Sequence, residues 1–353
     1  MTESAPMDGR SFVAAQSFLL EAKKYWTTTL YPELKADYAR RAGGRAVEST
    51  EEVGALIGET TLYHYYAWLE RHLQRMKYSG RYGLVPYHRG RRDELLPSLA
   101  DEGDNLELDA SLGLPKYYRA VDIHQHPGGV WRDDFAGFVY ERGARSTTPM
   151  LGAKHRDLHQ RFTDIVLEGG RPARLLDMGC GFGKSTRPFC DALPEAEIEA
   201  IDLAEPCLRL AAADAVEHQQ HHVRYRQRNA YASGYDDSTF DLVTSTMLMH
   251  ELPPKEIEQT FAEAARVLQP GGRMVHLDFY LLPDAFSRFI HYGHSRRNNE
   301  PFMPPLCELE LAAMLEGLGF RDVEITPFAE ADGVDTTDSP TWRFPWTVIS
   351  ARR

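Results

Sequence analysis

Residues 175–186 (LLDMGCGFGKST) combine an apolar run, a carboxylate and closely spaced glycines. The apolar run predicts a buried strand that ends at Asp177, with Gly179, Gly181 and Gly183 leading into a helix. Glycines at such a turn permit positive φ and carry no Cβ, so the backbone can approach a ligand closely. The G-x-G-x-G spacing differs from the G-x-G-x-x-G of dinucleotide sites and from a P-loop. An acidic residue beside the loop disfavours a pyrophosphate and suits an ammonium group.

Five segments in order resemble the class I S-adenosylmethionine (SAM)-dependent methyltransferases: LLDMGCGFG, AIDL (200–203), RNA (228–230), FDLVTSTMLMHEL and ARVLQPGGRMVHLDF. The resemblance covers roughly residues 171–353 and leaves the first 150 residues without a matching subfamily. It implies SAM as the cofactor and S-adenosylhomocysteine as the product. The implied activity is methyl transfer to an O, N or C atom of a small molecule, with a natural-product or secondary-metabolite intermediate as one candidate.

The resemblance also implies which residues hold the cofactor. Asp202 ends the second strand, where an acidic side chain in this family accepts both ribose hydroxyls in charge-assisted hydrogen bonds; a helix N-cap is the alternative role. Asn229 occupies the position that meets the adenine edge, with a plain turn residue as the alternative. The implied cofactor residues are Asp177, Gly179, Cys180, Gly181, Gly183, Asp202, Leu203, Asn229, Ala230, Thr246 and Met247.

Catalytic candidates follow the fourth and fifth strands. Methyl transfer needs alignment of the acceptor, methyl group and sulfur more than strong acid–base groups. His250 is a candidate general base because the pKa of histidine lies near neutrality; packing against the cofactor is the alternative. The segment 280–300, where this family often inserts a substrate cover, offers Tyr280 and His291 as further catalytic candidates. The same segment contains His294, Arg297, Asn298, Asn299 and Glu300.

A second histidine-rich segment, DIHQHPGG, contains Asp122, His124 and His126. These types could bind a metal, but no third ligand has convincing spacing, so we predict no metal site. Contact with substrate or cofactor and a structural role remain the alternatives.

From residue 171 onward, short apolar runs alternate with helical patterns. This alternation predicts an α/β fold: a Rossmann-like, mostly parallel seven-stranded sheet with helices on both faces. A final pair without a crossover helix is expected to close the sheet as an antiparallel hairpin. The expected strands are 174–177, 197–202, 222–227, 240–246, 274–279, 323–327 and 347–351.

We expect residues 1–150 to form a mainly helical N-terminal domain that caps the substrate or dimerises, and residues 151–353 to form the SAM-binding domain. Helices are expected over 11–40 and 51–76, and a turn with short strands over 77–87. A helical unit followed by a hairpin is typical of winged-helix-like modules, which is one interpretation of this domain.

Composition limits the partners. The net charge is −12, which disfavours nucleic acid because it is bound largely through Lys and Arg. No apolar run of membrane-spanning length and no secretory signal pattern occurs, and the 4 cysteines lack disulfide spacing, so we expect a cytoplasmic protein without a membrane partner. The expected partners are a partly apolar or aromatic small molecule and a second copy in a homodimer. Two alternative functions remain: an enzyme that uses bound SAM for other chemistry, and a SAM-binding DNA regulator.

Overall fold

The structure is a computed structural model that describes residues 9–99, 103–145 and 155–353. Its helices are α1 (Gly9–Tyr25), α2 (Tyr31–Ala42), α3 (Thr50–Ile57), α4 (Thr61–Tyr78), α5 (Leu84–Arg89), α6 (Arg92–Leu95), α7 (Lys116–Ala120), α8 (Ala136–Ala144), α9 (His155–Glu168), α10 (Thr186–Ala192), α11 (Glu205–Glu217), α12 (Pro254–Val267), α13 (Ala285–Asn298), α14 (Met303–Cys307) and α15 (Leu311–Gly317). Its strands are β1 (Leu106–Glu107), β2 (Arg174–Met178), β3 (Glu197–Asp202), β4 (Val223–Gln227), β5 (Phe240–Thr246), β6 (Leu268–Phe279), β7 (Arg321–Pro327) and β8 (Trp346–Arg352). None of the described helices is long and apolar enough to cross a membrane.

The strands form one sheet in the order β1-β4-β3-β2-β5-β6-β8-β7. Neighbouring strands run parallel except β8, which is antiparallel to both β6 and β7. The mostly parallel sheet and its closing antiparallel hairpin are therefore confirmed. The described sheet has one strand more than expected, because the two-residue β1 from the N-terminal half pairs with β4.

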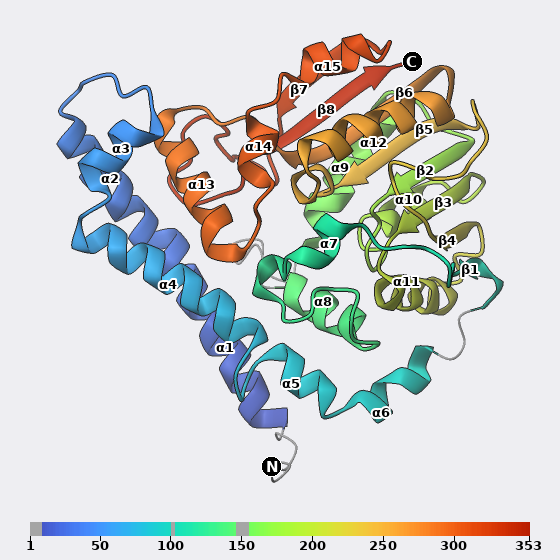
Figure 1. The fold of residues 1–353 in the computed structure, drawn as a ribbon, viewed down its shortest axis with the longest axis horizontal. Coiled ribbons are helices and arrows are strands. Elements are labelled where there is room, and N and C mark those ends of the chain that lie inside the picture. Colours follow the sequence, from blue (N-terminus) through green and yellow to red (C-terminus); the bar gives the residue numbers. More distant parts are fainter. Residues whose placement is uncertain (1–8, 100–102, 146–154) are drawn as a thin grey trace.

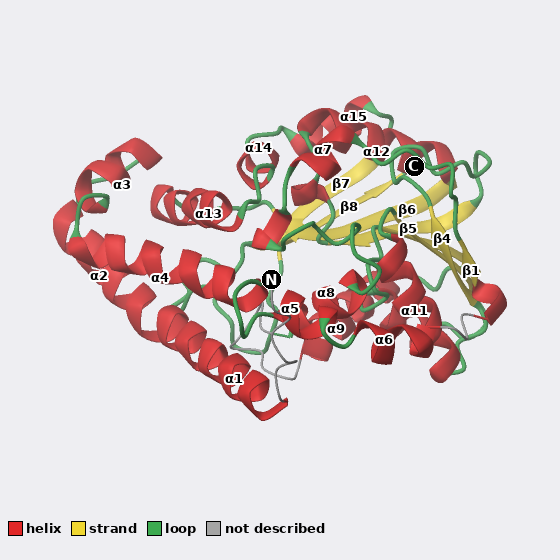
Figure 2. Cartoon of the chain, turned by 60° about the horizontal axis from the view of Figure 1, so that its bottom comes forward, coloured by secondary structure: helices red, strands yellow, loops and turns green. Residues whose placement is uncertain are grey.

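Helices cover both faces of the sheet (Figure 2). One core packs the apolar residues of α9, α10 and α11 against β2, β3 and β4. The other packs α12 and α15 against β2, β5 and β6. In α12, Ile257, Phe261 and Ala264 are fully buried on one helical face, as their spacing predicts. The Rossmann-like α/β class predicted from the sequence is confirmed.

Helices α1 to α4 form a helical arm beside the sheet (Figure 1). A π-helical turn (Trp26–Leu30) joins α1 to α2 without a loop. The Trp26 indole N–H donates to the carbonyl of Tyr66 at 3.1 Å and the two rings stack, which fixes α1 against α4. The single helix expected over 51–76 is interrupted after Gly58, and Thr60 caps the new helix by accepting from the N–H of Tyr63 at 3.2 Å.

The winged-helix-like interpretation of the N-terminal region is wrong in the described residues. Residues 77–87 form the end of α4, a turn and the start of α5 instead of a hairpin. The reason is burial: Leu84 and Val85 pack with Phe12, Phe135 and Val139 in a small core that a helix of this length satisfies. The domain boundary expected at residue 150 lies outside the described residues.

Helix α13 joins the two parts of the fold. It leaves the sheet after β6 and packs against α3 and α4 of the helical arm (Figure 1). Phe286 on α13 stacks on Tyr38 with ring centroids 4.7 Å apart. One apolar core therefore continues from the sheet into the arm.

The packing of α8 on α11 generates a stability prediction. A Cβ at Gly137 would overlap the carbonyl oxygen of Pro206, so the two helices approach this closely only because position 137 is glycine. We expect Gly137→Ala to lower the free energy of unfolding by about 1–3 kcal/mol, measured in urea. Gly317→Ala is the control, because nothing lies within 4 Å of a Cβ there. Equal stability of Gly137→Ala and the wild type would refute this account of the contact.

Candidate active site

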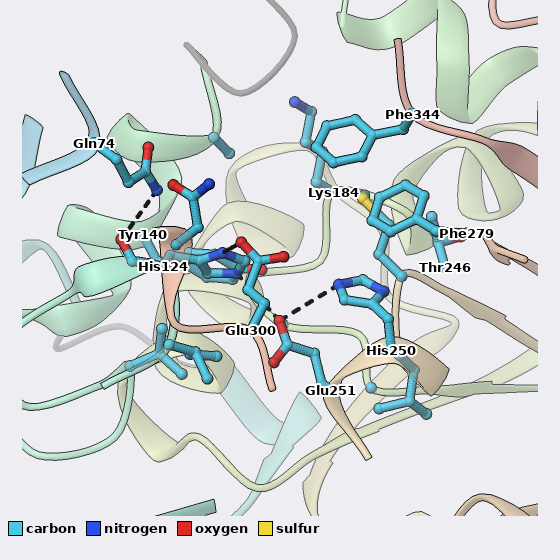
Figure 3. A pocket seen from close by; sticks show the side chains of 18 of the residues that line it. Gln74, His124, Tyr140, Lys184, Thr246, His250, Glu251, Phe279, Glu300 and Phe344 are labelled. Carbon is cyan, nitrogen blue, oxygen red and sulfur yellow. Dashed lines mark hydrogen bonds and ion pairs between the residues drawn. The ribbon is translucent and has the colours of Figure 1, made fainter. Parts of the chain in front are cut away.

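The carboxyl ends of β2, β3, β5 and β6 open into a cavity of about 220 Å³ that faces the helical arm (Figure 3). The sheet side is lined by Gly179, Cys180, Gly181, Phe182, Lys184, Ser185, Asp202, Thr246, Met247, Leu248, His250, Glu251 and Phe279. The arm and the later segments contribute Lys23, Trp26, Thr27, Glu70, Leu73, Gln74, Lys77, Tyr78, Tyr140, His294, Asn298, Glu300, Trp342, Phe344 and Trp346. Ligands of open α/β sheets bind at this edge.

The glycine loop crosses from β2 toward β3. The N–H groups of Gly179 and Cys180 both donate to the carbonyl of Ile201, at 2.7 and 3.0 Å. Gly181 has φ +53° and its N–H donates to Oδ2 of Asp202 at 2.9 Å. The loop and the strand-end carboxylate thus form one rigid wall of the cavity.

Asp202 is held at this wall by backbone donors. Its Oδ1 accepts from the N–H of Ala204 at 2.8 Å, which is a turn just before α11. Burial raises the pKa of the carboxyl group, while the hydrogen bonds from Ala204, Gly181 and Leu203 lower it. Each carboxylate oxygen has further lone pairs, so hydroxyl groups in the cavity can still donate to it. The turn role and a ligand role are compatible.

Asp177 lies beneath the glycine loop instead of on the cavity surface. Its Oδ2 accepts from the Thr186 hydroxyl at 2.6 Å and from Ser185 at 3.4 Å, whereas its buried Oδ1 has no hydrogen-bond partner. Burial is the main cause that raises the pKa of this carboxyl to about 7. A buried carboxylate oxygen without a partner is costly, which marks a place for an external donor.

The end of β5 carries two unusual features. The buried hydroxyl of Thr246 has no hydrogen-bond partner among the described residues, and Met247 has φ +59°, a conformation that costs energy for a residue with a side chain. The N–H of Met247 donates to the carbonyl of Leu277 at 2.8 Å, which holds the strained residue in place. Such strain persists where the surrounding structure fixes it, often at functional sites.

His250 follows on a short 3₁₀ turn (Met249–Glu251) and is fixed by Asp278 of β6. Its Nδ1–H donates to Oδ1 of Asp278 at 2.6 Å, and its Nε2 lies 3.5 Å from Oε1 of Glu251 (Figure 3). Asp278 itself accepts from the N–H groups of Met249 and Phe279. Burial opposes the charge on His250, yet the carboxylates of Asp278 and Glu251 hold the pKa of the imidazole well above its usual range.

An ionic chain continues from Glu251 toward the helical arm. His124 places Nε2 3.2 Å from Glu251 and Nδ1 3.0 Å from Glu300 (Figure 3). Burial lowers the pKa of His124, but Glu300 and Glu251 outweigh this and raise it to about 9. His294 lies 3.9 Å from Glu300 and donates to Glu70 at 2.5 Å.

Glu70 of α4 is the last carboxylate of this chain. It pairs with both His294 and Arg297 of α13, and Asn298 lies 3.4 Å away. Burial raises the pKa of Glu70, but Arg297 and His294 outweigh it and bring the pKa to about 2. An ionic chain of Asp278, His250, Glu251, His124, Glu300, His294, Glu70 and Arg297 therefore connects the sheet to the arm.

Aromatic rings from β6, from β8 and from the segment before β8 form a further wall of the cavity. Phe279 stacks on Phe344 with centroids 4.3 Å apart, and Trp346 meets Phe279 edge-on at 4.8 Å. Trp342 packs against Trp26 of the arm at 5.1 Å. A flat apolar group can be sandwiched here, with the ionic chain on its polar side.

Some of the expected site residues lie outside this cavity. Leu203, Gly183, Asn229 and Ala230 do not line it in the described structure: Asn229 accepts from the N–H of Tyr231, Ala230 belongs to the second core, and a Cβ at Gly183 would meet Tyr225. Asp177 is one layer below. The roles assigned to these residues stay predictions.

Two catalytic candidates are also outside it. The Tyr280 hydroxyl donates to the carbonyl of Leu309 at 2.7 Å, so it is engaged in packing the sheet face. His291 lines a second cavity, and burial lowers the pKa of its imidazole to about 3. Of the three expected catalytic residues, His250 is the one that lines the main cavity.

Residues that the helical arm and the interior of β6 contribute to the site were not predicted from the sequence. Asp278 is an acid inside the apolar run VHLDF, which is a pattern that favours a functional carboxylate. Glu70, Gln74 and Lys77 occupy the buried face of α4 among Leu69 and Leu73, but helical periodicity alone gives them no chemical role.

An open, mostly parallel sheet with a glycine loop after β2 and an acid at the end of β3 is the arrangement of class I methyltransferase domains. Residues 175–272 match the protein family described as a methyltransferase domain. The chain thus contains a class I SAM-dependent methyltransferase domain.

Similar proteins carry methyltransferase names. The demethylmenaquinone methyltransferase of Thermus thermophilus is 34% identical over 34% of this chain and 53% of its own length. The ubiquinone/menaquinone biosynthesis C-methyltransferase UbiE of Dinoroseobacter shibae is 31% identical over 44% of this chain and 64% of its own. The chain therefore spans between half and two thirds of the length of these curated relatives.

A solved structure, the phosphoethanolamine N-methyltransferase 2 of Haemonchus contortus in complex with S-adenosyl-L-methionine, is 17% identical with a TM-score of 0.48. The match covers 68% of this chain and 60% of that chain.

The charge on His124 generates a pH prediction. Because its folded pKa of about 9 lies above the unfolded value, its stabilising effect is complete below about pH 6.5 and is lost as pH rises through about 9. We expect His124→Gln to lower the free energy of unfolding by about 2–3 kcal/mol at pH 6.5, and the difference from wild type to shrink by pH 9.5. Urea unfolding at both pH values measures it. His64→Gln, at an exposed site on α4, is the control. A difference that stays flat or grows with pH would contradict the charged chain.

Proposed function

We propose that this protein transfers the methyl group of SAM to a small molecule with a flat, partly apolar body. The observation that carries the proposal is that the glycine loop, Asp202, His250 and the aromatic wall all open into one cavity. The cofactor and an acceptor bound there would meet beside the end of β5. The helical arm forms the remaining wall and excludes water from that meeting point.

The residues present fit the cofactor. Asp202 lines the cavity and keeps lone pairs that two ribose hydroxyls could use, and Gly181 beside it has no side chain. The orphaned Oδ1 of Asp177 and the unpartnered hydroxyl of Thr246 are buried polar groups at the same edge of the sheet. When bound, SAM supplies a methyl carbon already activated by its sulfonium. The demand on the chain is therefore to align the acceptor.

The aromatic wall meets that demand. Rings at Phe279, Phe344 and Trp346 give a rigid apolar surface against which a planar acceptor is held in one orientation. As the acceptor forms its bond to carbon, the carbon–sulfur bond breaks and the acceptor loses its proton. Of the cavity residues predicted to be catalytic, His250 is the one whose side chain could accept this proton.

His250 acts through its Nε2. Asp278 positions the ring by accepting from Nδ1, so Nε2 is the nitrogen on the side of Glu251. With its pKa raised, the ring holds its proton at neutral pH and cannot yet act as a base. A positive charge bound in the cavity would lower this pKa by repulsion, toward the range in which a base is effective. The alternative for an amine acceptor is that His250 only orients it.

The relatives support a small organic acceptor. Their names specify demethylmenaquinone, ubiquinone and menaquinone biosynthesis, and nocamycin in Saccharothrix syringae. The wall of aromatic rings agrees with a flat acceptor of this general kind. A natural-product intermediate is one candidate.

The cofactor assignment predicts a binding loss. Asp202→Ala removes the acceptor for the ribose hydroxyls, and we expect the affinity for S-adenosylhomocysteine to fall more than tenfold in calorimetry. Asp236→Ala, at an exposed position, is the control and keeps the wild-type affinity. Unchanged affinity in Asp202→Ala would sink the ribose assignment. Turnover of an acceptor without formation of S-adenosylhomocysteine would show that methyl transfer is wrong.

The assignment of His250 predicts a change in the pH profile. A base works in its neutral form, so turnover of a hydroxyl acceptor rises with pH through the pKa of the ring. We expect His250→Gln to reduce turnover about 100-fold or more and to abolish this limb, as measured by S-adenosylhomocysteine formation across pH. His218→Gln, at an exposed position, is the control. An alanine variant at 250 with normal turnover and pH dependence would exclude the base.

A further inference from the structure

Lys77 lines the cavity from the helical arm and forms no ion pair with the described residues. Lys77 lies on α4, its side chain is 2% exposed, and it lines the cavity. Among the described residues it makes no ion pair; its nearest partner is the ring face of Tyr78, 4.9 Å from Nζ. Burial, and then the charge of Lys23, lower its pKa well below the usual value, and they outweigh the charge of Glu300, which raises it. An anion beside this amine would favour its protonated form.

The glutamates that line the cavity form ion pairs with other residues and not with Lys77. Glu70 is paired with Arg297 and His294, and Glu300 with His124. Glu251 is paired in the same way with His124 and His250. Each of these acids already has a cationic partner.

Two polar neighbours extend the positive surface. Lys23 of α1 also lines the cavity, and its Nζ donates to Oε1 of Gln74 at 3.3 Å. The amide of Gln74 donates in turn to the carbonyl of His124 (Figure 3). Gln74 is therefore held with its oxygen toward Lys23, and both lysines line the cavity from the helical arm.

We propose that Lys77, with Lys23 beside it, binds an anionic group of the acceptor, so that the substrate class is a flat organic acid. The aromatic wall holds the apolar body, and the lysines hold its carboxylate or another acidic group. The proposal rests on the proposed function, since it assigns the substrate of that same cavity.

The chemistry of the arm favours this ligand. An anion beside Lys77 takes a position at which the described residues place no ion-pair partner, and it favours the protonated form of this lysine. A neutral ligand would leave Lys77 as it stands. The carboxylate of the cofactor is the other source of the same chemistry, which the experiment separates from the acceptor.

The test uses the full chain saturated with S-adenosylhomocysteine and two matched probe pairs. Calorimetry compares indole-3-acetate with indole-3-acetamide, and 2-naphthoate with 2-naphthamide. In the wild type we expect at least one acid to bind about tenfold or more tightly than its amide. Lys77→Met keeps the length of the side chain and should reduce that preference below about threefold. Lys24→Met, at a partly exposed lysine paired with Glu21, should leave it unchanged.

A stability measurement shows whether Lys77 serves the fold. Because the lysine has no ion-pair partner, we expect Lys77→Met to raise the melting temperature by about 2 °C or more at pH 7 without ligand. A lower melting temperature would reveal a structural role and count against the proposal.

Each remaining outcome is decisive. The absence of an acid preference in both wild-type pairs, or a preference that survives in Lys77→Met, overturns the proposal. A tenfold loss of S-adenosylhomocysteine affinity in Lys77→Met, without an effect on the acids, assigns the lysine to the cofactor and also overturns it. Failure of the wild type to bind S-adenosylhomocysteine would instead refute the proposed function.

Discussion

The structure depends on buried ion pairs between helix α4 of the arm and helix α13, which follows the sheet strand β6. Glu70 on the arm and Arg297 with His294 on α13 are almost fully buried, so each is tolerable only beside the other. Removing one partner of such a set leaves a bare charge, at a cost of about 3–5 kcal/mol. Apolar packing between α4 and α13 could shift in register, whereas this match of charges and hydrogen bonds fixes one position. The arm is thus located relative to the sheet by chemistry that also lines the cavity.

The same constraint reaches the strand ends. The ionic chain passes through His124 and Glu251 to His250, and Asp278 holds the other side of the ring, so three separate parts of the sequence meet at His250. Oriented charges of this kind act without reorganising when a reaction develops charge, which is the most effective way for a protein to stabilise it. The strained backbone at Met247 lies three residues before His250, at the same strand end.

Local patterns predicted the sheet and little beyond it. The expected strands 197–202 and 240–246 coincide with β3 and β5. These strands could be predicted because the apolar residues of each strand and the turns that bound it lie close together in the sequence. The glycine loop was recognised for the same reason. The ionic chain could not be, because His124 and Glu300 are 176 residues apart and Glu70 and Arg297 are 227 apart. The hairpin expected after α4 failed because turn residues there begin a buried helix, which tertiary packing decides.

The region that matches the methyltransferase family lines one part of the cavity, and residues outside that region line the rest. The matched region, residues 175–272, contains the glycine loop, Asp202 and His250. Phe279, Trp342 and the whole helical arm lie outside it. A shared domain therefore accounts for the side of the cavity on which a common cofactor would lie. The residues on the other walls lie outside the matched region, and it is to them that we assign the acceptor.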